Sequence, residues 1–363
     1  MIGPHPFRLF MNPHHGVPGI VVLTAAGFRR AKDTITAWPG YRPTPLHDLP
    51  LPGVVRLKDE GPRFGLGSFK ALGGAYAVER CSAAERAHGN QAITVTCATD
   101  GNHGRSVAWG AQRFGCRCVI FVHETVSQGR IDAIAAYGAE VIRVPGNYDD
   151  SVREADRQAQ AQGWFVISDT SYPGYTEVPR DVMQGYRLMA DEAADQWAGP
   201  PPTHVFIQAG VGGAAAAVSI QMRARFDPAP QLVIVEPERA ACLFESARAG
   251  APSVVAGALD TIMAGLACGE PSLLAWQELG RAASAFMTIP DAAAAEILRW
   301  LADLGLSIGE SGVAGLAGYA LAAADETSRQ QLGLGADSRV LLFGTEGITD
   351  RSVYDCIRRA GPV

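Results

Sequence analysis

The chain has 363 residues, of which 47% are hydrophobic, and it carries a formal net charge of −6 at pH 7. A chain of this length can bury a large core, and two domains are expected. No basic block stands out, so nucleic acid and anionic membranes are not expected as partners. No apolar run approaches the roughly 20 residues that a membrane-spanning helix needs.

Residues 1–16 are rich in proline and histidine and lack the apolar stretch of a signal peptide. The seven cysteines are dispersed and odd in number, which is typical of proteins of the reducing cytosol. We therefore expect a cytoplasmic protein. Cys242 and Cys268 are the pair to check for a bridge, and the sequence leaves open whether they form one.

The first half of the chain contains an irregular segment and then a regular α/β pattern. Residues 1 to about 45 are expected to be irregular, and a short strand follows over 54–57. From residue 92 onward apolar strands alternate with amphipathic helices, which is typical of βαβ units and a parallel sheet. The strands are predicted over 92–97, 119–122, 141–144 and 165–167, and the helices over 103–114, 131–137 and 151–161.

The same alternation starts again in the second half. Strands are predicted over 204–207, 232–235 and 340–343, and helices over 182–197, 214–226, 291–304 and 312–324. The pattern predicts an α/β fold with two open, twisted, mostly parallel sheets flanked by helices. We expect a small domain over 88–185 and a large domain built from 1–87 and 186–363.

Lys70 follows a glycine-rich loop and begins a stretch of small residues. Its sequence neighbours Phe64, Leu66, Phe69 and Leu72 are apolar. Partial desolvation of a lysine favours the neutral amine, which is the form that makes an imine with an aldehyde. Taken alone, Lys70 could equally be a surface lysine at a helix start.

Two further loops connect a predicted strand to a predicted helix. In Thr99–Arg105, backbone N–H groups can hold an anion such as a carboxylate, and the Asn102 amide can donate to a phenolate-type oxygen. In Gln208–Ala215, glycines let the backbone curl around a phosphate at a helix start. A capped turn and close helix-on-strand packing are the respective structural alternatives. A third turn, over 343–350, follows the last predicted strand.

Together, the lysine, the anion-binding turn and the glycine loop match the needs of pyridoxal phosphate. The lysine holds the aldehyde, the glycines hold the phosphate, and the asparagine meets the ring hydroxyl. Their joint occurrence is more specific than any one of them. The large domain is therefore predicted to bind this cofactor, and no metal is expected.

Several stretches add a resemblance to a known family. They are Lys58–Glu60, Arg63–Leu66, Phe69–Gly74, Thr99–Arg105, Asp169–Thr170, Gly174–Thr176, Met183–Tyr186 and Ile262–Pro271. Through them the chain resembles the fold-type II pyridoxal-phosphate enzymes, which include threonine dehydratase and the tryptophan synthase β chain. More closely it resembles the diaminopropionate ammonia-lyase family, nearly from end to end.

The resemblance implies roles for individual residues. Lys70 matches the Schiff-base lysine, and Asp100 and Asp169 match bases for opposite stereoisomers of the substrate. A carboxylate whose pKa is raised by burial can indeed remove an α-proton. The other implied cofactor contacts are Phe69, Asn102, Gly210, Val211, Gly212, Gly213, Glu310 and Thr345. The implied substrate contacts are Thr99, Asp100, Gly101 and His103.

One position departs from the family pattern. Gly344 stands where related enzymes tend to carry a serine near the pyridine nitrogen. Either Thr345 takes over the hydrogen bond to that nitrogen, or the nitrogen has a different partner. The departure affects the choice of substrate more than the type of reaction.

The expected reaction is pyridoxal-phosphate-dependent α,β-elimination on a β-substituted amino acid, with 2,3-diaminopropionate giving pyruvate and ammonia as the first candidate. The alternative within the class is a dehydratase of a β-hydroxy amino acid such as serine, threonine, hydroxyaspartate or phenylserine. A non-catalytic sensor of amino acid or cofactor is the alternative from another class, and the presence of Lys70 argues against it. The resemblance also implies a homodimer.

Overall fold

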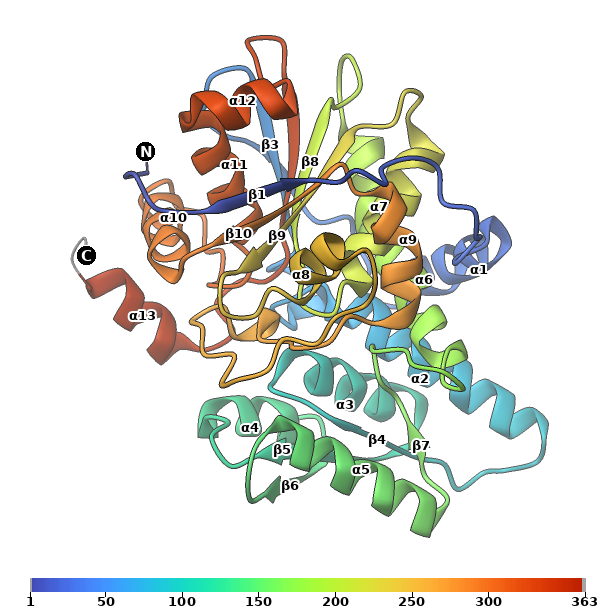
Figure 1. The fold of residues 1–363 in the computed structure, drawn as a ribbon. Helices are drawn as coiled ribbons and strands as arrows, with labels where there is room; N and C mark the ends of the chain where they lie inside the picture. The colour runs from blue at the N-terminus through green and yellow to red at the C-terminus, as the bar shows by residue number, and fades with distance from the viewer. Residues whose placement is uncertain (1, 361–363) are drawn as a thin grey trace. The chain divides into compact units, whose positions relative to one another are not determined.

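The computed structural model describes residues 2–360, which form two compact units (Figure 1). Unit 1 contains the described residues up to Val22, Pro43–Pro62, and the described residues from Met189 onward; unit 2 contains Leu23–Arg42 and Arg63–Leu188. Residues 63–87, and Lys70 with them, thus group with the 88–185 segment. The domain division predicted from the sequence, at residues 88 and 185, stays a prediction.

Unit 1 is built on a seven-stranded sheet with the order β1-β10-β9-β8-β11-β3-β2. The edge strands β1 and β2 pair antiparallel with their neighbours, and the inner pairs are parallel. The inner strands are buried on both faces, which is why they are continuous apolar runs in the sequence. The strands are β1 (Arg8–Met11), β2 (Leu46–Asp48), β3 (Val54–Asp59), β8 (His204–Gln208), β9 (Gln231–Pro237), β10 (Ala285–Ile289) and β11 (Arg339–Gly344).

Helices cover the sheet of unit 1. Helix α11 packs on β8 to β11 and, with α10, contributes much of the main hydrophobic core of this unit (Figure 1). The helices of unit 1 are α7 (Gly213–Arg225), α8 (Cys242–Ala249), α9 (Leu273–Ala282), α10 (Asp291–Asp303), α11 (Ala314–Ala324), α12 (Glu326–Leu332) and α13 (Arg351–Arg359), with the short 3-10 helix Ala264–Leu266. The bounds of α6 (Glu177–Gln196) span the division between the units.

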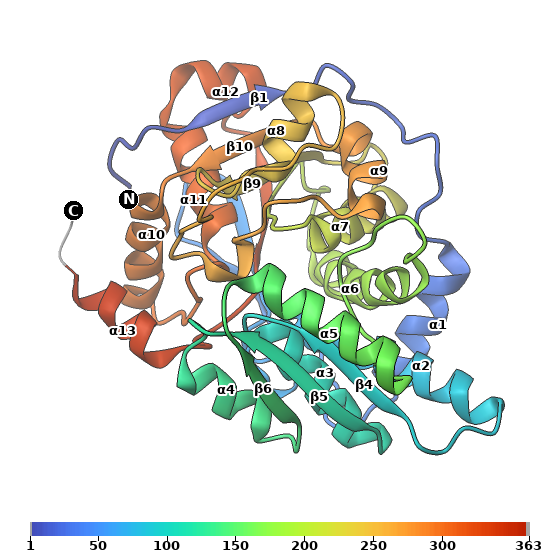
Figure 2. The same ribbon diagram turned by 60° about the horizontal axis from the view of Figure 1, so that its bottom comes forward.

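Unit 2 contains a four-stranded parallel sheet with the order β6-β5-β4-β7. Figure 2 shows α5 across one face of this sheet, and α3 packs on β4 and β5 from the other face. Its strands are β4 (Thr94–Ala98), β5 (Arg117–His123), β6 (Glu140–Val144) and β7 (Phe165–Val166). Its helices are α1 (Ala25–Thr36), α2 (Lys70–Ala87), α3 (Asn102–Phe114), α4 (Gln128–Ala135) and α5 (Tyr148–Gln162), with the short 3-10 helix Arg63–Gly65.

Glycines let the helix that begins with Lys70 approach its neighbour closely. A Cβ atom at Gly110 of α3 would lie 2.7 Å from the Cα of Ala75 in α2. That distance is shorter than any normal contact between carbon atoms, so only glycine permits this spacing. The close contact of α2 with α3 fixes the start of α2 relative to the Thr99–Arg105 loop.

The expectation that residues 1 to about 45 are irregular is wrong. β1 is a short strand that completes the edge of the sheet by pairing with β10. Helix α1 is capped by Thr24, whose hydroxyl accepts from Gly27 N at 3.0 Å, and it buries Phe28, Ala31 and Ile35. The spacing of these three residues is that of one helix face, but the surrounding prolines hid the pattern.

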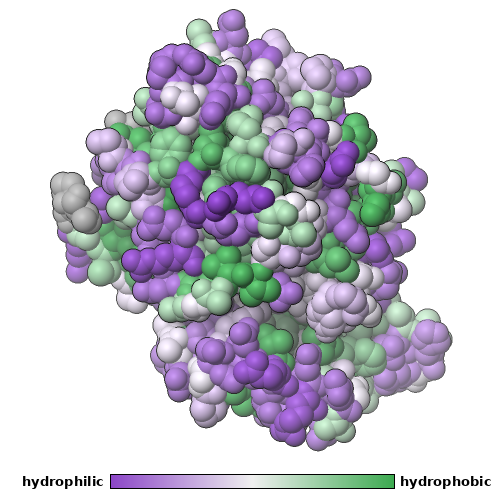
Figure 3. All heavy atoms as spheres, in the orientation of Figure 1, coloured by the Kyte–Doolittle hydropathy of each residue, from purple (hydrophilic) through white to green (hydrophobic). Residues whose placement is uncertain are grey.

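The predicted α/β fold class is confirmed. The predicted strands and helices are present within a few residues of their observed bounds, and both sheets are mostly parallel. No helix among residues 2–360 is long and apolar enough to cross a membrane. All seven cysteines, Cys242 and Cys268 included, are free thiols. Hydrophilic residues predominate in the view of Figure 3, with hydrophobic residues interspersed.

Candidate active site

The amine of Lys70 forms an ion pair and a hydrogen bond with Asp169 in unit 2. Lys70 is the first residue of α2, and Asp169 lies in the turn between β7 and α6. Their side chains are 21% and 17% exposed, respectively. The structure therefore brings together two of the three residues predicted to be catalytic.

Lys70 lies beside aromatic and apolar side chains. Its Nζ is 5.3 Å from the centre of the Phe69 ring and 5.7 Å from that of Tyr186. Leu66 and Leu72 are buried, whereas Phe64 packs against Trp38 and Trp109. The amine is thus partly removed from water, as the nucleophilic role of a lysine requires.

The electrostatics of Asp169 depend on Lys70. Burial is the largest single influence and raises the pKa of Asp169, but the charge of Lys70, the nearby His103 and the hydrogen bonds together lower it by more, so that the pKa lies below its ordinary value. If Lys70 were uncharged, the largest of these lowering influences would be absent, and the pKa of Asp169 would be higher. Asp169 is then a carboxylate suited to take up a proton.

His103 contributes a neutral imidazole next to this pair. Its Nε2 lies 2.7 Å from the carbonyl oxygen of Ile167 and therefore donates to it. Burial lowers the pKa of His103, which keeps the ring neutral and makes Nδ1 an acceptor. Nδ1 lies 3.8 Å from Asp169 Oδ2 and makes no hydrogen bond within residues 2–360.

The loop that carries the predicted substrate contacts is held by Thr99. The Thr99 hydroxyl accepts from the backbone N–H groups of Gly101 and Gly104, both at 3.0 Å. Gly101 precedes α3 and offers no side-chain cap, and Asn102 is the first residue of that helix. The loop therefore presents a helix N-terminus, the feature expected of a carboxylate site.

Asp100 has its own hydrogen-bond partners. Its Oδ1 lies 2.8 Å from His123 Nε2, and its backbone oxygen accepts from Arg130 Nη1 at 3.2 Å. The Asp100 side chain is 34% exposed. The third predicted catalytic residue is thus held in place by histidine and arginine.

In unit 1 the glycine loop has the shape of a phosphate cradle. The loop leaves β8, and α7 begins at Gly213 after Gly212, which has φ +96° and no side-chain cap. A Cβ at Gly210 would lie 2.9 Å from Cys268 Sγ, so a side chain there would disturb the packing. Val211 accepts a hydrogen bond from Ser272 N at 2.9 Å through its backbone oxygen. A glycine turn at the start of a 13-residue helix fits a phosphate.

Thr345 is positioned by Gln208. Gln208 Nε2 donates to Thr345 Oγ1 at 2.7 Å and to the carbonyl oxygen of Phe343 at 2.8 Å. Because the Thr345 oxygen accepts this hydrogen bond, its own O–H remains able to donate to a ring nitrogen. Thr345 and Glu310 are both buried.

The structure gives a physical reason for Gly344. A Cβ atom at this position would lie 2.9 Å from Cδ1 and 3.3 Å from Cγ2 of Ile308. A serine at position 344 would therefore require Ile308 to move. The neighbouring Thr345 supplies a hydroxyl without this conflict.

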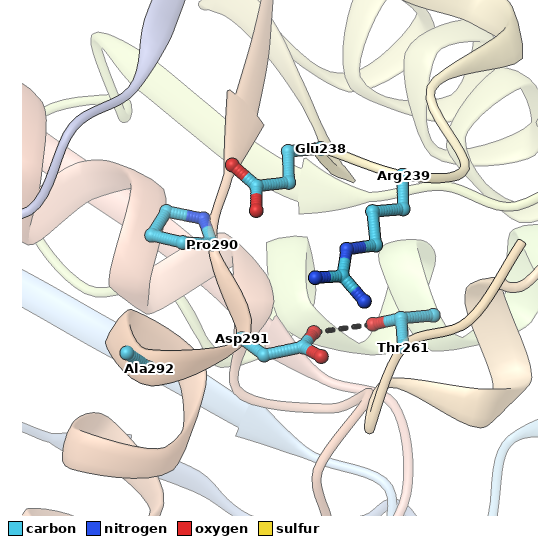
Figure 4. A pocket seen from close by; sticks show the side chains of 6 residues that line it. All are labelled: Glu238, Arg239, Thr261, Pro290, Asp291 and Ala292. Carbon is cyan, nitrogen blue, oxygen red and sulfur yellow. Dashed lines mark hydrogen bonds between the residues drawn. The ribbon is translucent and has the colours of Figure 1, made fainter. Parts of the chain in front are cut away.

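A cavity in unit 1, shown in Figure 4, contains none of the predicted site residues. It is lined by Glu238, Arg239, Thr261, Pro290, Asp291 and Ala292. Asp291 accepts hydrogen bonds from the Thr261 hydroxyl and from Ile262 N. Its carboxylate thus holds the 261–262 segment to the start of α10. Within residues 2–360 no group of three or more His, Cys, Asp or Glu side chains is arranged to hold a metal ion.

The sequence reasoning assigned no role to His123, Gln208 or Tyr186. His123 and Gln208 are the last residues of β5 and β8. Polar residues at the carboxyl ends of parallel strands are a recognisable signal, because ligands of such sheets bind there. Tyr186 belongs to one of the stretches that carry the resemblance, but its contact with Lys70 depends on the packing of α6 and could not be read from the sequence.

These features define an α/β protein with a lysine paired to a carboxylate in unit 2 and a glycine turn at a helix start in unit 1. The family model described as "Pyridoxal-phosphate dependent enzyme" matches residues 37–344, and the chain belongs to this family. It is therefore an enzyme that uses pyridoxal phosphate. The predicted fold-type II class is confirmed.

Comparison with known proteins also confirms the closer resemblance. The diaminopropionate ammonia-lyase of Escherichia coli (strain K12) is 42% identical over 347 residues, which are 87% of this chain and 87% of the relative. The protein of the same name from Salmonella typhimurium (strain LT2) is 38% identical over 359 residues, 88% of each chain. The crystal structure of the holo Escherichia coli protein matches with a TM-score of 0.92 and 35% identity, covering 99% of this chain and 98% of that chain.

Proposed function

We propose that the protein is an ammonia-lyase that converts 2,3-diaminopropionate to pyruvate and ammonia by α,β-elimination. The observation that carries this proposal is the pairing of Lys70 with Asp169, an amine that can hold the cofactor and a carboxylate that can act as a base. The similarity to relatives of this activity over 87% of the chain supports the choice of substrate.

When bound, pyridoxal phosphate supplies an electron sink that makes the α-hydrogen of the amino acid acidic. Lys70, which Phe69 and Tyr186 keep partly desolvated, would tether the aldehyde. In unit 1 the Gly210–Gly213 turn would hold the phosphate, and the Thr345 hydroxyl would donate to the ring nitrogen. Asn102 would donate to the ring hydroxyl, and Glu310 would be a further cofactor contact.

The two aspartates remove the α-proton from opposite enantiomers. Asp169 stays ionised while Lys70 is charged, and its affinity for a proton rises once that charge is gone. Asp100 is oriented by His123 and removes the α-proton from the other enantiomer. Thr99 holds the turn in which Gly101 and the α3 N-terminus receive the substrate carboxylate, and His103 lies next to Asp169. Loss of the β-amine and hydrolysis then give one pyruvate and two ammonia.

The deciding experiment measures release of 2-oxo acid from D- and L-diaminopropionate and from serine, threonine, hydroxyaspartate and phenylserine. We expect diaminopropionate to be the best substrate. If only the hydroxy amino acids react, the protein is a dehydratase and the ammonia-lyase proposal is wrong.

A spectroscopic test addresses the non-catalytic alternative. The purified protein should be yellow, and the absorbance band should vanish on borohydride reduction and in Lys70→Ala. A colourless protein that never takes up the cofactor would instead favour a sensor.

A homodimer and a cytoplasmic location are also part of the proposal. The resemblance supports the homodimer, and the seven free, dispersed cysteines suit a reducing compartment. Light scattering coupled to gel filtration tests the first, and cell fractionation tests the second. A monomer, or recovery outside the cytoplasm, would contradict them.

A further inference from the structure

A chain of three hydrogen-bonded side chains leads from the predicted base Asp100 to an exposed residue of unit 2. Asp100 Oδ1 is 2.8 Å from His123 Nε2, and His123 Nδ1 is 2.9 Å from Thr125 Oγ1. The His123 side chain is 18% exposed and that of Asp100 34%, while Thr125 is exposed.

Strand register creates this arrangement. β4 and β5 are neighbouring parallel strands, with Ala98 opposite Phe121. The pairing continues past the end of β4, because Thr99 N donates to the carbonyl oxygen of Phe121 at 3.0 Å. Asp100 therefore leaves the sheet beside His123, the last residue of β5.

Arginines hold the backbone at both ends of this series of hydrogen-bonded side chains. Arg130 Nη1 donates to the backbone oxygen of Asp100 at 3.2 Å. Arg143 Nη1 donates to the backbone oxygen of Val126 at 2.9 Å, next to Thr125. The turns that carry the first and the last side chain are thus fixed independently of the side-chain hydrogen bonds.

The donor and acceptor roles follow from the chemistry of the groups. An ionised carboxylate only accepts hydrogen bonds, so His123 Nε2 carries a proton and donates to Asp100 Oδ1. In the neutral ring Nδ1 is then an acceptor, and the Thr125 hydroxyl donates to it. Thr125 therefore selects the tautomer that can hold Asp100. With Oδ1 engaged by His123, Asp100 Oδ2 is the oxygen that can take up a proton.

We propose that His123, oriented by Thr125, is a positioning residue that sets Asp100 for proton removal from one enantiomer of the substrate. The inference rests on the proposed function, and it adds that the two enantiomers depend on different supporting residues. Of the two aspartates, Asp100 is paired with His123, whereas Asp169 is paired with Lys70. Loss of His123 should therefore lower kcat on one enantiomer of the substrate and leave kcat on the other unchanged.

The test measures kcat and KM of the holoenzyme for D- and L-diaminopropionate. The Asp100→Asn variant first identifies the enantiomer that depends on Asp100. On that enantiomer His123→Leu should lower kcat by about ten- to a hundredfold, which is part of the 10²–10⁴ that a positioned base supplies, with little change in KM. On the other enantiomer kcat should stay within about twofold of wild type, because Asp169 is untouched.

Conservative variants separate positioning from general damage. His123→Gln keeps an N–H donor and should recover part of the lost kcat, and Thr125→Ser should resemble wild type. Thr125→Val removes the hydroxyl and should lower kcat by roughly threefold to tenfold on the same enantiomer only, the size expected for one hydrogen bond. Glu124→Gln, a change of the exposed residue between them, is the matched control and should change neither enantiomer.

A second readout does not depend on activity. In holoenzyme labelled with ¹⁵N in the imidazole rings of its eight histidines, the His123 signals are assigned by their loss in His123→Gln. Asp100→Ala should shift the Nε2 signal, and Thr125→Val should shift that of Nδ1. Unchanged His123 signals in both variants would overturn the proposal.

The outcomes also distinguish this inference from the proposed function. If the wild-type protein eliminates neither enantiomer, the proposed function fails whatever His123 does. If it eliminates both and His123→Leu lowers both equally or neither, the function stands and His123 is an ordinary surface partner of Asp100.

Discussion

Lys70 and Asp169 form an ion pair in unit 2 in which each side chain is less than a quarter exposed, at 21% and 17%. The contact couples the charge of the Lys70 amine to the protonation of the Asp169 carboxylate. While the amine is charged, it keeps the carboxylate ionised, and once the amine is engaged as a neutral group, burial favours proton uptake by the carboxylate. If Asp169 acts as the proposed base, it therefore gains affinity for a proton when Lys70 loses its charge.

The two aspartates should be separable by stereochemistry. Asp169→Asn should lower kcat on one enantiomer of diaminopropionate by about 10²–10⁴, the contribution of a positioned general base. Asp100→Asn should do the same on the opposite enantiomer. Steady-state kinetics with each pure enantiomer measure both effects. An equal loss on both enantiomers in either variant would remove the assignment of two bases.

The glycine loop should tolerate no side chain. In Gly210→Ala the new Cβ would lie 2.9 Å from Cys268 Sγ, so the turn must shift. We expect cofactor affinity to fall by at least about tenfold, equivalent to roughly 1.4 kcal/mol. Absorbance titration of the cofactor-free protein measures this.

Gly335→Ala is the control for this loop variant, because Gly335 is in the same unit and nothing lies within 4 Å of its would-be Cβ. The affinity of the Gly335→Ala variant for the cofactor should equal that of wild type. If Gly210→Ala also binds the cofactor normally, the loop does not hold the phosphate.

Because of Glu236, the free energy of unfolding should decrease as the pH rises. Burial raises the pKa of this fully buried carboxyl to about 8 from the ordinary value of 4.5, although it accepts hydrogen bonds from Leu243 N and Phe244 N. The folded protein thus retains a proton that the unfolded chain has lost. This contribution to stability is complete below pH 4.5, decreases through the interval, and is lost as the pH passes about 8.

The magnitude is up to about 1.4 kcal/mol per pH unit within this interval. Urea unfolding of wild type and of Glu236→Gln at several pH values across it measures the effect. The free energy of unfolding of Glu236→Gln should depend less steeply on pH than that of wild type. Parallel curves for the two proteins would show that Glu236 is ionised in the folded state.

Removal of Lys58 should destabilise unit 1 strongly. Lys58 Nζ is fully buried and contacts Glu192 Oε2, Gln196 Oε1 and the backbone oxygen of Thr44, at 2.8, 2.8 and 2.7 Å. Lys58→Met removes one partner of a buried ion pair with Glu192, and breaking a buried pair in this way costs about 3–5 kcal/mol. The free energy of unfolding in urea measures the loss.

Arg248→Ala is the surface control for Lys58. It removes an ion pair with Glu245 in which the side chains are 55% and 30% exposed. Such pairs contribute about 0–1 kcal/mol. Comparable losses in both variants would mean that the buried network contributes no more than a surface pair.

The sequence is informative about this protein where a residue's neighbours along the chain decide its environment. Buried parallel strands such as 232–235 are continuous apolar runs, and loops that follow them are where sheets of this class place ligands. The three predicted loops, and Lys70 at the start of a helix, could therefore be found without coordinates.

The parts that could not be predicted depend on contacts between distant segments. Nothing in the sequence pairs Asp100 with His123, because the contact arises from the register of β4 and β5. In the same way Gln208 reaches Thr345 across 137 positions of the chain. The edge strand β1 escaped detection because four residues are too few for a periodic pattern, and it is defined by its partner β10.

The contact between Gly344 and Ile308 has a consequence for how this family can diversify. A substitution that adds a side chain at position 344 meets Ile308 first, so either the Ile308 side chain must shift or a smaller residue at position 308 must accompany the change. The two positions are therefore epistatic, and the order of changes matters. While Ile308 keeps its present position, glycine fits at 344 without displacing it, and the nearest hydroxyl along the chain is that of Thr345.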